Sequence, residues 1–124
     1  MFISDLKSCP EFIAGDKTIL RELLHPDKAD LELRYNLAHA TLKPGDTSYR
    51  HYLLTSEVYY ILEGNGIMTI GEEKQEVYPG QAIYIPPEAW QCILNPGPRD
   101  LKFICIVDPA WRKEDKVVSP DNGK

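Results

Sequence analysis

Residues 44–66 decide the fold of this chain and read PGDTSYRHYLLTSEVYYILEGNG. Turn-forming residues bound the stretch, Pro-Gly at its start and Gly-Asn-Gly at its end, and β-branched and aromatic residues fill it. Because side chains alternate between the faces of a strand, His51 and Leu53 are expected on one face. Glu57 and Tyr59 have the same parity and join them if no bulge intervenes. An imidazole and a carboxylate on one face can hold a metal ion or transfer a proton, although a solvated surface hairpin would show the same pattern.

The rest of the chain shows the same alternation of short apolar runs and turn residues, with 10 Pro and 8 Gly spread along it. Strands at regular short intervals, each bounded by Pro or Gly, predict an all-β antiparallel sandwich or barrel. The further expected strands are Glu11–Ala14, Thr18–Leu24, Leu31–Leu42, Ile67–Ile70, Lys74–Tyr78, Gln81–Ile85, Trp90–Leu94 and Leu101–Val107. The first two would form a hairpin around Gly15-Asp16, although 18–24 could instead be a helical turn.

The chain has 124 residues, the length of one domain with a single core. We expect a barrel over 35–111, N-terminal strands or an arm over 1–34 that pack on it, and a flexible, charged tail over 112–124. In Leu101–Val107 both parities are apolar except at Lys102, which predicts burial on both faces. One face would line the barrel and the other would contact a partner subunit or the N-terminal strands.

Composition narrows the classes of function. The net charge of −5 argues against a nucleic-acid partner, since phosphate binding needs a basic face. No window approaches the roughly 18 apolar residues of a membrane span, and no signal peptide is recognised at the N-terminus. The 3 Cys residues are widely spaced and form no CxxC pair, which favours reduced thiols in a cytoplasmic protein.

Two motifs resemble those of the cupin superfamily. Four residues lie at the spacing of the first cupin motif, G-x5-H-x-H-x3–4-E-x6-G: Gly45, His51, Glu57 and Gly64. Residues 79–95 resemble the second motif, which ends P-x-G-x2-H-x3-N. The likeness spans 35–107, so the chain resembles a small single-domain cupin of the conserved-barrel (cupin-2) type. This resemblance implies a double-stranded β-helix, or jelly-roll, barrel, often dimeric in that family.

The resemblance also implies a metal site, because many cupins hold a divalent ion such as zinc, nickel, iron or manganese. In metal-binding cupins two His and a Glu from the first motif and a His from the second bind the ion. His51 and Glu57 match, whereas Leu53 and Gln91 stand where the other two His would be. Leu53 cannot coordinate a metal, and Gln91 offers only a neutral carbonyl oxygen. The implied site is therefore incomplete.

His39 is a further candidate ligand. If Leu37, His39 and Thr41 face inward, His39 completes a set of two His and one carboxylate with His51 and Glu57. If the more apolar alternate residues, Ala38, Ala40 and Leu42, face inward, His39 lies on the surface. Three aromatic residues are candidates for the mouth of a substrate pocket, although ordinary barrel packing would explain them equally well: Tyr59, Trp90 and Tyr84.

The sequence therefore favours a small-molecule-binding cupin with a degenerate metal site at His51, Glu57, Gln91 and His39. As an enzyme it would be a metal-dependent isomerase, lyase or dioxygenase acting on a small oxygenated substrate, such as a sugar or a keto acid. The alternative is a non-catalytic ligand-binding or sensor domain without metal, which the loss of two ligand positions favours. The expected partners are a small-molecule ligand and a second copy of the chain in a homodimer.

Overall fold

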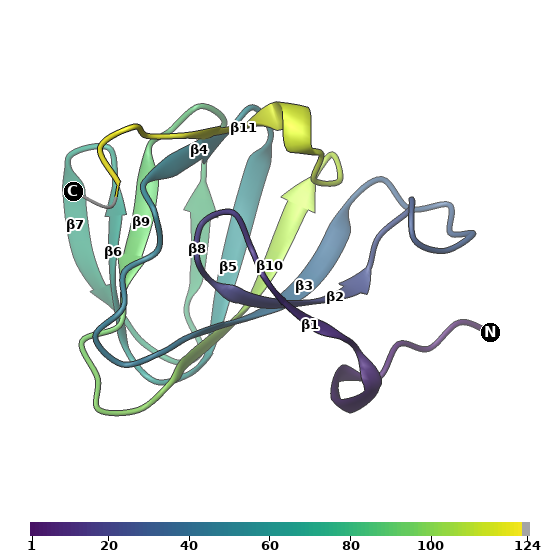
Figure 1. Ribbon diagram of the computed structural model, residues 1–124, viewed down its shortest axis with the longest axis horizontal. Helices are drawn as coiled ribbons and strands as arrows, with labels where there is room; N and C mark the ends of the chain where they lie inside the picture. Colours follow the sequence, from purple (N-terminus) through teal and green to yellow (C-terminus); the bar gives the residue numbers. More distant parts are fainter. Residues whose placement is uncertain (123–124) are drawn as a thin grey trace.

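The computed structural model describes residues 1–122 and forms a barrel of two antiparallel β-sheets that face each other (Figure 1). The six-stranded sheet has the order β1 (Glu11–Ile13), β2 (Ile19–Leu24), β3 (Asn36–Leu42), β10 (Leu101–Asp108), β5 (Ser56–Glu63) and β8 (Ala82–Ile85). The five-stranded sheet has the order β11 (Lys116–Val118), β4 (His51–Leu53), β9 (Gln91–Leu94), β6 (Gly66–Ile70) and β7 (Glu73–Val77). Two short 3-10 helices complete the secondary structure of 1–122: η1 (Leu6–Ser8) and η2 (Lys113–Asp115). The predicted all-β barrel is confirmed.

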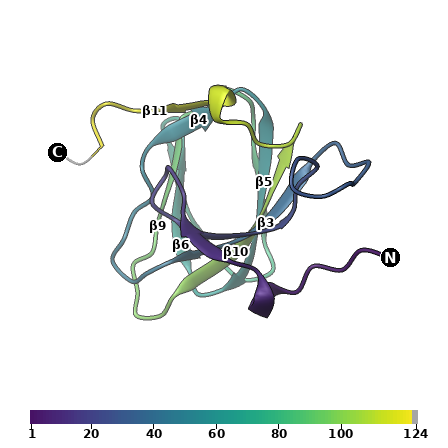
Figure 2. The same cartoon turned by 45° about the vertical axis from the view of Figure 1, so that its right-hand side comes forward.

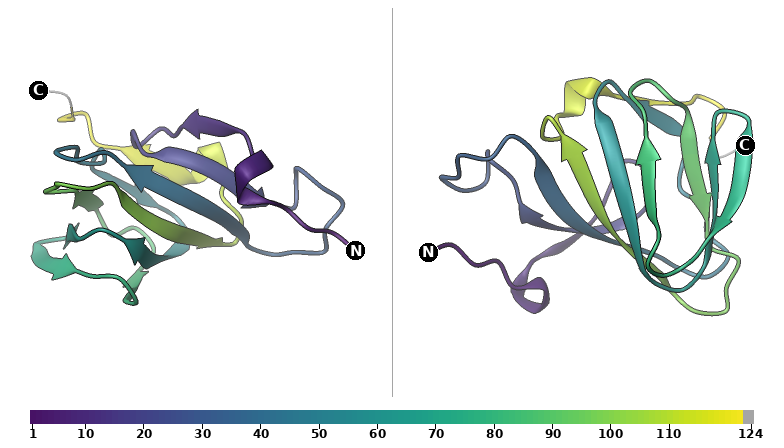
Figure 3. Two further views of the ribbon diagram at one scale, coloured as in Figure 1. Left: turned by 90° about the horizontal axis from the view of Figure 1, so that it is seen from below. Right: turned by 180° about the vertical axis from the view of Figure 1, so that it is seen from behind.

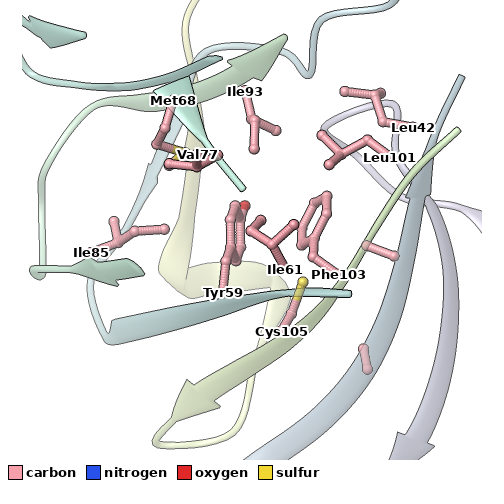
Figure 4. Packing of buried hydrophobic residues seen from close by; sticks show 12 residues of the cluster. Leu42, Tyr59, Ile61, Met68, Val77, Ile85, Ile93, Leu101, Phe103 and Cys105 are labelled. Carbon is pink, nitrogen blue, oxygen red and sulfur yellow. The ribbon is translucent and has the colours of Figure 1, made fainter. Parts of the chain in front are cut away.

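The core lies between the sheets and follows from the period of two in the strands. In β10, Leu101, Phe103, Cys105 and Val107 are buried, whereas the residues between them are half-buried on the outer face. Phe103 packs against Tyr59 of β5, with 4.5 Å between ring centroids (Figure 4). The other members of the core cluster come from β5 and five further strands: Ala38, Ala40, Leu42, Ile61, Met68, Val77, Ile85 and Ile93.

Gly64 shows why the turn after β5 needs glycine. Its φ is +74°, in the left-handed region that L side chains rarely adopt. A Cβ at this position would also lie 2.5 Å from the carbonyl oxygen of Asp100. The backbone conformation and the close approach of Asp100 therefore explain the last glycine of the first motif, without any role in ligand binding.

The N-terminal strands enlarge the six-stranded sheet instead of covering its outer face. β1 pairs with β2, and β2 pairs with β3 at the edge of the sheet, as Figures 1 and 3 show. The expected hairpin over 11–24 is thereby confirmed. The outer face of β10, formed by Lys102, Ile104 and Ile106, remains half-exposed in a single subunit.

Two expected segments differ in the structure. The strand predicted to start at Leu31 starts at Asn36, because Asn36 pairs with Val107 near the end of β10 and β10 continues only to Asp108. The tail expected to be flexible instead forms η2 and β11, because Lys116–Val118 pair with β4, which would otherwise have a free edge. Residues 123–124 of that expected tail lie outside the described residues. Within 1–122, no helix has the length and apolar character needed to cross a membrane.

Candidate functional site

A pocket of about 600 Å³ opens into one end of the barrel. Figure 2 looks toward the barrel interior, with β4 and β11 on one side and β3 and β10 on the other. The β1–β2 hairpin, the loop after β2 and the segment 111–116 contribute to the rim. The volume lies in the range of small-molecule sites, which are typically about 300–1,000 Å³.

Three ionisable side chains meet on the pocket wall: His51 from β4, Glu57 from β5 and Asp16 from the turn between β1 and β2. His51 Nε2 lies 3.8 Å from Asp16 Oδ2. His51 Nδ1 lies 2.7 Å from the carbonyl oxygen of Tyr49. Because a carbonyl only accepts, Nδ1 carries the hydrogen and the lone pair of Nε2 faces Asp16 and the pocket. All three side chains belong to buried residues.

Glu57 is held by a chain of hydrogen bonds inside the barrel. Gln91 on β9 donates from Nε2 to Glu57 Oε1 at 2.9 Å. The other end of the same amide, Gln91 Oε1, accepts a hydrogen bond from the Tyr59 hydroxyl at 3.0 Å. The amide thus ties β9 to two residues of a single strand, β5, in the opposite sheet, and Glu57 keeps one oxygen for the pocket.

Burial shifts the acid–base chemistry of this wall. Desolvation raises the pKa of Glu57 from 4.5 to about 8, and the Asp16 charge adds to the shift, whereas the hydrogen bond from Gln91 opposes it. Desolvation lowers the pKa of His51, although the Asp16 carboxylate and the bond to Tyr49 act in the opposite direction. Burial therefore moves the two pKa values in opposite directions, toward a protonated carboxyl group at Glu57 and a neutral imidazole at His51.

Asp16 and Lys116 belong to this wall and were missed by the sequence reasoning. Asp16 is fixed by its Oδ1, which accepts from the Thr18 hydroxyl at 2.6 Å and from the Thr18 amide at 3.1 Å. Lys116 lies beside the same turn, because a Cβ built on Gly15 would be 3.1 Å from its Nζ. The only signal in the sequence was the Gly15-Asp16 turn, and nothing there indicated that it reaches His51.

The other predicted site residues divide between the pocket and the outer side of the barrel. Tyr59 lines the pocket, as expected. His39 does not, because Ala38 and Ala40 take the inner face of β3 and His39 lies between Arg21 and Ile104 on the outer face. It is nevertheless buried there, and this environment lowers its pKa through desolvation first and the nearby Lys102 charge second.

Trp90 and Tyr84 also lie away from the pocket. Trp90 packs edge-on against Tyr52 at 4.7 Å and carries Arg50 over its ring at 5.7 Å. Tyr84 is 63% exposed on the edge strand β8. The aromatic residues at the rim are Trp111, from the C-terminal segment, and Phe12, from β1.

The family profile described as "Cupin domain" matches residues 38–107, more than half of the chain. The chain belongs to the cupin family. Its relatives include both a protein of similar length and longer proteins. It is 43% identical over 108 residues to "Uncharacterized protein MJ1618" of Methanocaldococcus jannaschii, and the match covers 86% of each chain.

This cupin also resembles one part of a longer enzyme. It is 30% identical over 125 residues to "Mannose-1-phosphate guanylyltransferase ManC" of Salmonella typhimurium, and the match covers 94% of this chain but 26% of that protein. The chain therefore spans about a quarter of the length of that relative. Among solved structures, a predicted oxalate decarboxylase from Thermotoga maritima superposes with a TM-score of 0.77 at 18% identity, covering 87% of this chain and 99% of that one. This likeness shows the fold.

The cupin family often binds divalent metals, so the donor set of this cupin requires a test against such a site. Leu53, on the pocket wall, has no donor atom. The Gln91 amide already uses its nitrogen for Glu57 and its oxygen for Tyr59. In 1–122, no three His, Cys, Asp or Glu side chains are grouped to hold an ion. The residues present therefore do not fit the family's resident metal.

Proposed function

We propose that this cupin binds a small hydroxy-carbonyl compound, such as a sugar, in the barrel pocket and transfers protons on it with His51 and Glu57. The observation that carries the proposal is geometric: His51 and Glu57 line the same buried pocket, with His51 Nε2 and one Glu57 oxygen left for a ligand. Burial lowers the pKa of His51 and raises that of Glu57, which suits a base and an acid that work at the same pH. The name of the mannose-1-phosphate guanylyltransferase relatives supports a sugar-like ligand.

The proposed step is a balanced proton exchange. His51 Nε2 takes the proton from the carbon next to the carbonyl, and the released electron pair forms the C=C bond of an enediol as Glu57 protonates the carbonyl oxygen. Glu57 then recovers a proton from the neighbouring hydroxyl group, and His51 returns its proton to the former carbonyl carbon. The net change is isomerisation of the hydroxy-carbonyl unit. Asp16, at 3.8 Å, stabilises the charged imidazole between the two halves of the reaction.

Deuterium exchange tests this proposal directly. The protein is incubated in D2O with D-mannose 6-phosphate, D-fructose 6-phosphate, dihydroxyacetone and pyruvate, and carbon-bound deuterium is followed by NMR. We expect incorporation next to the carbonyl of at least one compound, and a loss of about 100-fold or more in rate in His51→Gln and in Glu57→Gln. Glu73→Gln, on the exposed face of β7, is the matched control and should exchange like wild type.

The alternative function is a non-catalytic ligand-binding domain. The replacement of two family metal-ligand positions by Leu53 and Gln91 favours it. Saturable binding of a panel compound without deuterium incorporation would select this alternative. We also propose a cytoplasmic location, which the 3 unpaired cysteines support.

A further inference from the structure

The pocket has a second polar end, on the same face of the six-stranded sheet as Glu57 but toward the β1–β2 edge. Glu22 on β2 faces the pocket, and its Oε2 accepts a hydrogen bond from Asn36 Nδ2 at 3.1 Å. Asn36 is itself buried and accepts from the Trp111 amide at 2.7 Å. No hydrogen bond within 1–122 uses the second carboxyl oxygen of Glu22. Desolvation raises the pKa of Glu22, as expected for a carboxyl group that the pocket shields.

Strand register fixes the distance between the two ends. Glu57 pairs with Val107, and Val107 pairs with Asn36, so Glu57 and Asn36 stand two strands apart in one row. Neighbouring strands are about 4.8 Å apart, which puts these two backbone positions roughly 10 Å from each other. In the adjacent row, Tyr59 and Glu22 stand three strands apart.

The floor between the ends is small and apolar. The intervening residues on the inner face are Val107 in one row and Cys105 and Ala38 in the other. All three line the pocket, and none offers a charged group. Burial raises the pKa of the Cys105 thiol well above its ordinary value, so this residue acts as a small hydrophobic side chain. The floor leaves room for a carbon skeleton but provides no charge to bind it.

We propose that Glu22 and Asn36 form a second polar subsite, and that the substrate is an extended polyhydroxylated molecule the size of a six-carbon sugar. This inference rests on the proposed function and narrows its substrate class. One end of such a molecule hydrogen-bonds to Glu57 and His51, its carbon skeleton lies over Ala38 and the rest of the apolar floor, and a distal hydroxyl group donates to Glu22.

Calorimetric titration with D-mannose, D-mannitol and glycerol tests the two-ended pocket. Wild type should bind the two six-carbon compounds, and Glu22→Ala should weaken their affinity about tenfold or more. Glycerol is too short to use both ends, so its weaker binding should be unchanged by Glu22→Ala. Glu73→Ala is the matched control, because Glu73 is exposed on β7 and remote from the pocket. Glu22→Gln keeps the side chain's shape and serves as the second variant if Glu22→Ala lowers the melting temperature.

The outcomes separate this inference from the proposed function. A loss of six-carbon affinity in Glu22→Ala, with glycerol unaffected, supports the second subsite. Unchanged six-carbon affinity in both Glu22 variants overturns it, and so does a wild type that binds neither six-carbon compound. Either of these two results could occur together with deuterium exchange on a three-carbon compound. The proposed function would then stand without the second subsite. Absence of both binding and exchange would overturn the two together.

Discussion

Gln91 Nε2 lies 2.9 Å from Glu57 Oε1, and this hydrogen bond joins the two sheets inside the barrel. Gln91 occupies the position at which the second cupin motif has a metal-binding His. The amide donates to the carboxyl group that would share such an ion, and it also accepts from Tyr59. We conclude that the substitution converts a metal-ligand position into part of a hydrogen-bonded acid.

Glu57→Gln should change how stability depends on pH. The folded state keeps the Glu57 proton up to a pKa of about 8, whereas the unfolded chain releases it near 4.5. Wild type should therefore lose stability as pH rises between these two values, by at most 1.4 kcal/mol per pH unit and roughly 5 kcal/mol in total. The variant has no such proton and should show a flatter profile over the same window.

Urea unfolding of both proteins at intervals from pH 4 to pH 9 measures this difference. The variant should gain stability relative to wild type at the alkaline end and lose that advantage at the acidic end. Parallel profiles for the two proteins would contradict a buried, protonated Glu57. Glu63→Gln is the control, since Glu63 is an exposed member of the same strand.

Leu53→His should restore strong binding of zinc. Leu53 is 4% exposed, lines the pocket and lies two residues from His51 on the same face of β4. A second imidazole there would join His51 and Glu57 as a third strong ligand. We expect zinc affinity at least 100-fold tighter than that of wild type in calorimetric titration. Leu54→His adds the same group at a position that is 48% exposed, and an equal gain in that control would show that the effect is unrelated to the pocket.

Asn95, the last residue of the second motif, has a structural role. Its buried Nδ2 donates to the carbonyl oxygens of Leu42 and Arg99, each at 2.8 Å, and its Oδ1 accepts from the Gly97 amide at 2.8 Å. Asn95→Ala would leave these backbone groups without their partner, so it should cost roughly 3 kcal/mol of unfolding free energy. Urea unfolding measures the loss, and exposed Asn65→Ala should change stability little. A loss below about 1 kcal/mol would contradict the assigned role.

Local patterns in the sequence predicted the inner wall of the barrel. Alternation placed His51 and Leu53 on one face and gave Glu57 and Tyr59 the same parity, and all four line the pocket. For β3, the more apolar of the two alternatives is the correct one, because Ala38, Ala40 and Leu42 fill the core. The sequence alone could not decide whether His39 faces inward or outward, because a small apolar residue on each side of a histidine is compatible with either orientation.

The rim of the pocket could not be predicted, because it depends on contacts between distant segments. Asp16 reaches His51 only because its turn is held across the barrel end, where the Asp16 carbonyl accepts from the Tyr49 amide at 2.7 Å. Lys116 arrives from a tail whose charge suggested flexibility. Aromatic residues such as Trp90 suit both a pocket and ordinary packing, so residue type alone could not distinguish the two.

The last prediction concerns the outer face of the six-stranded sheet, for which we expect a homodimer. Ile104 pairs with Tyr60 on the neighbouring strand, and Ile106 lies in the next row beside Val58, which in turn pairs with Tyr84. Tyr60 is 44% exposed and Tyr84 is 63% exposed, so the patch formed by these two rows faces solvent in a single subunit. A contiguous apolar patch on a sheet face is typical of a protein–protein interface.

Sedimentation velocity at micromolar concentration should therefore show a dimer for wild type. Ile104→Glu places a carboxylate in the centre of the patch, and burying it without a partner should shift the dimer dissociation constant by about 100-fold or more. Leu54→Glu, which adds the same charge at an exposed position off this patch, should remain dimeric. A monomeric wild type at these concentrations would contradict the prediction. A dimer that Ile104→Glu leaves intact would place the interface elsewhere, because an isoleucine in the middle of the contact could not accept a buried charge without loss of affinity.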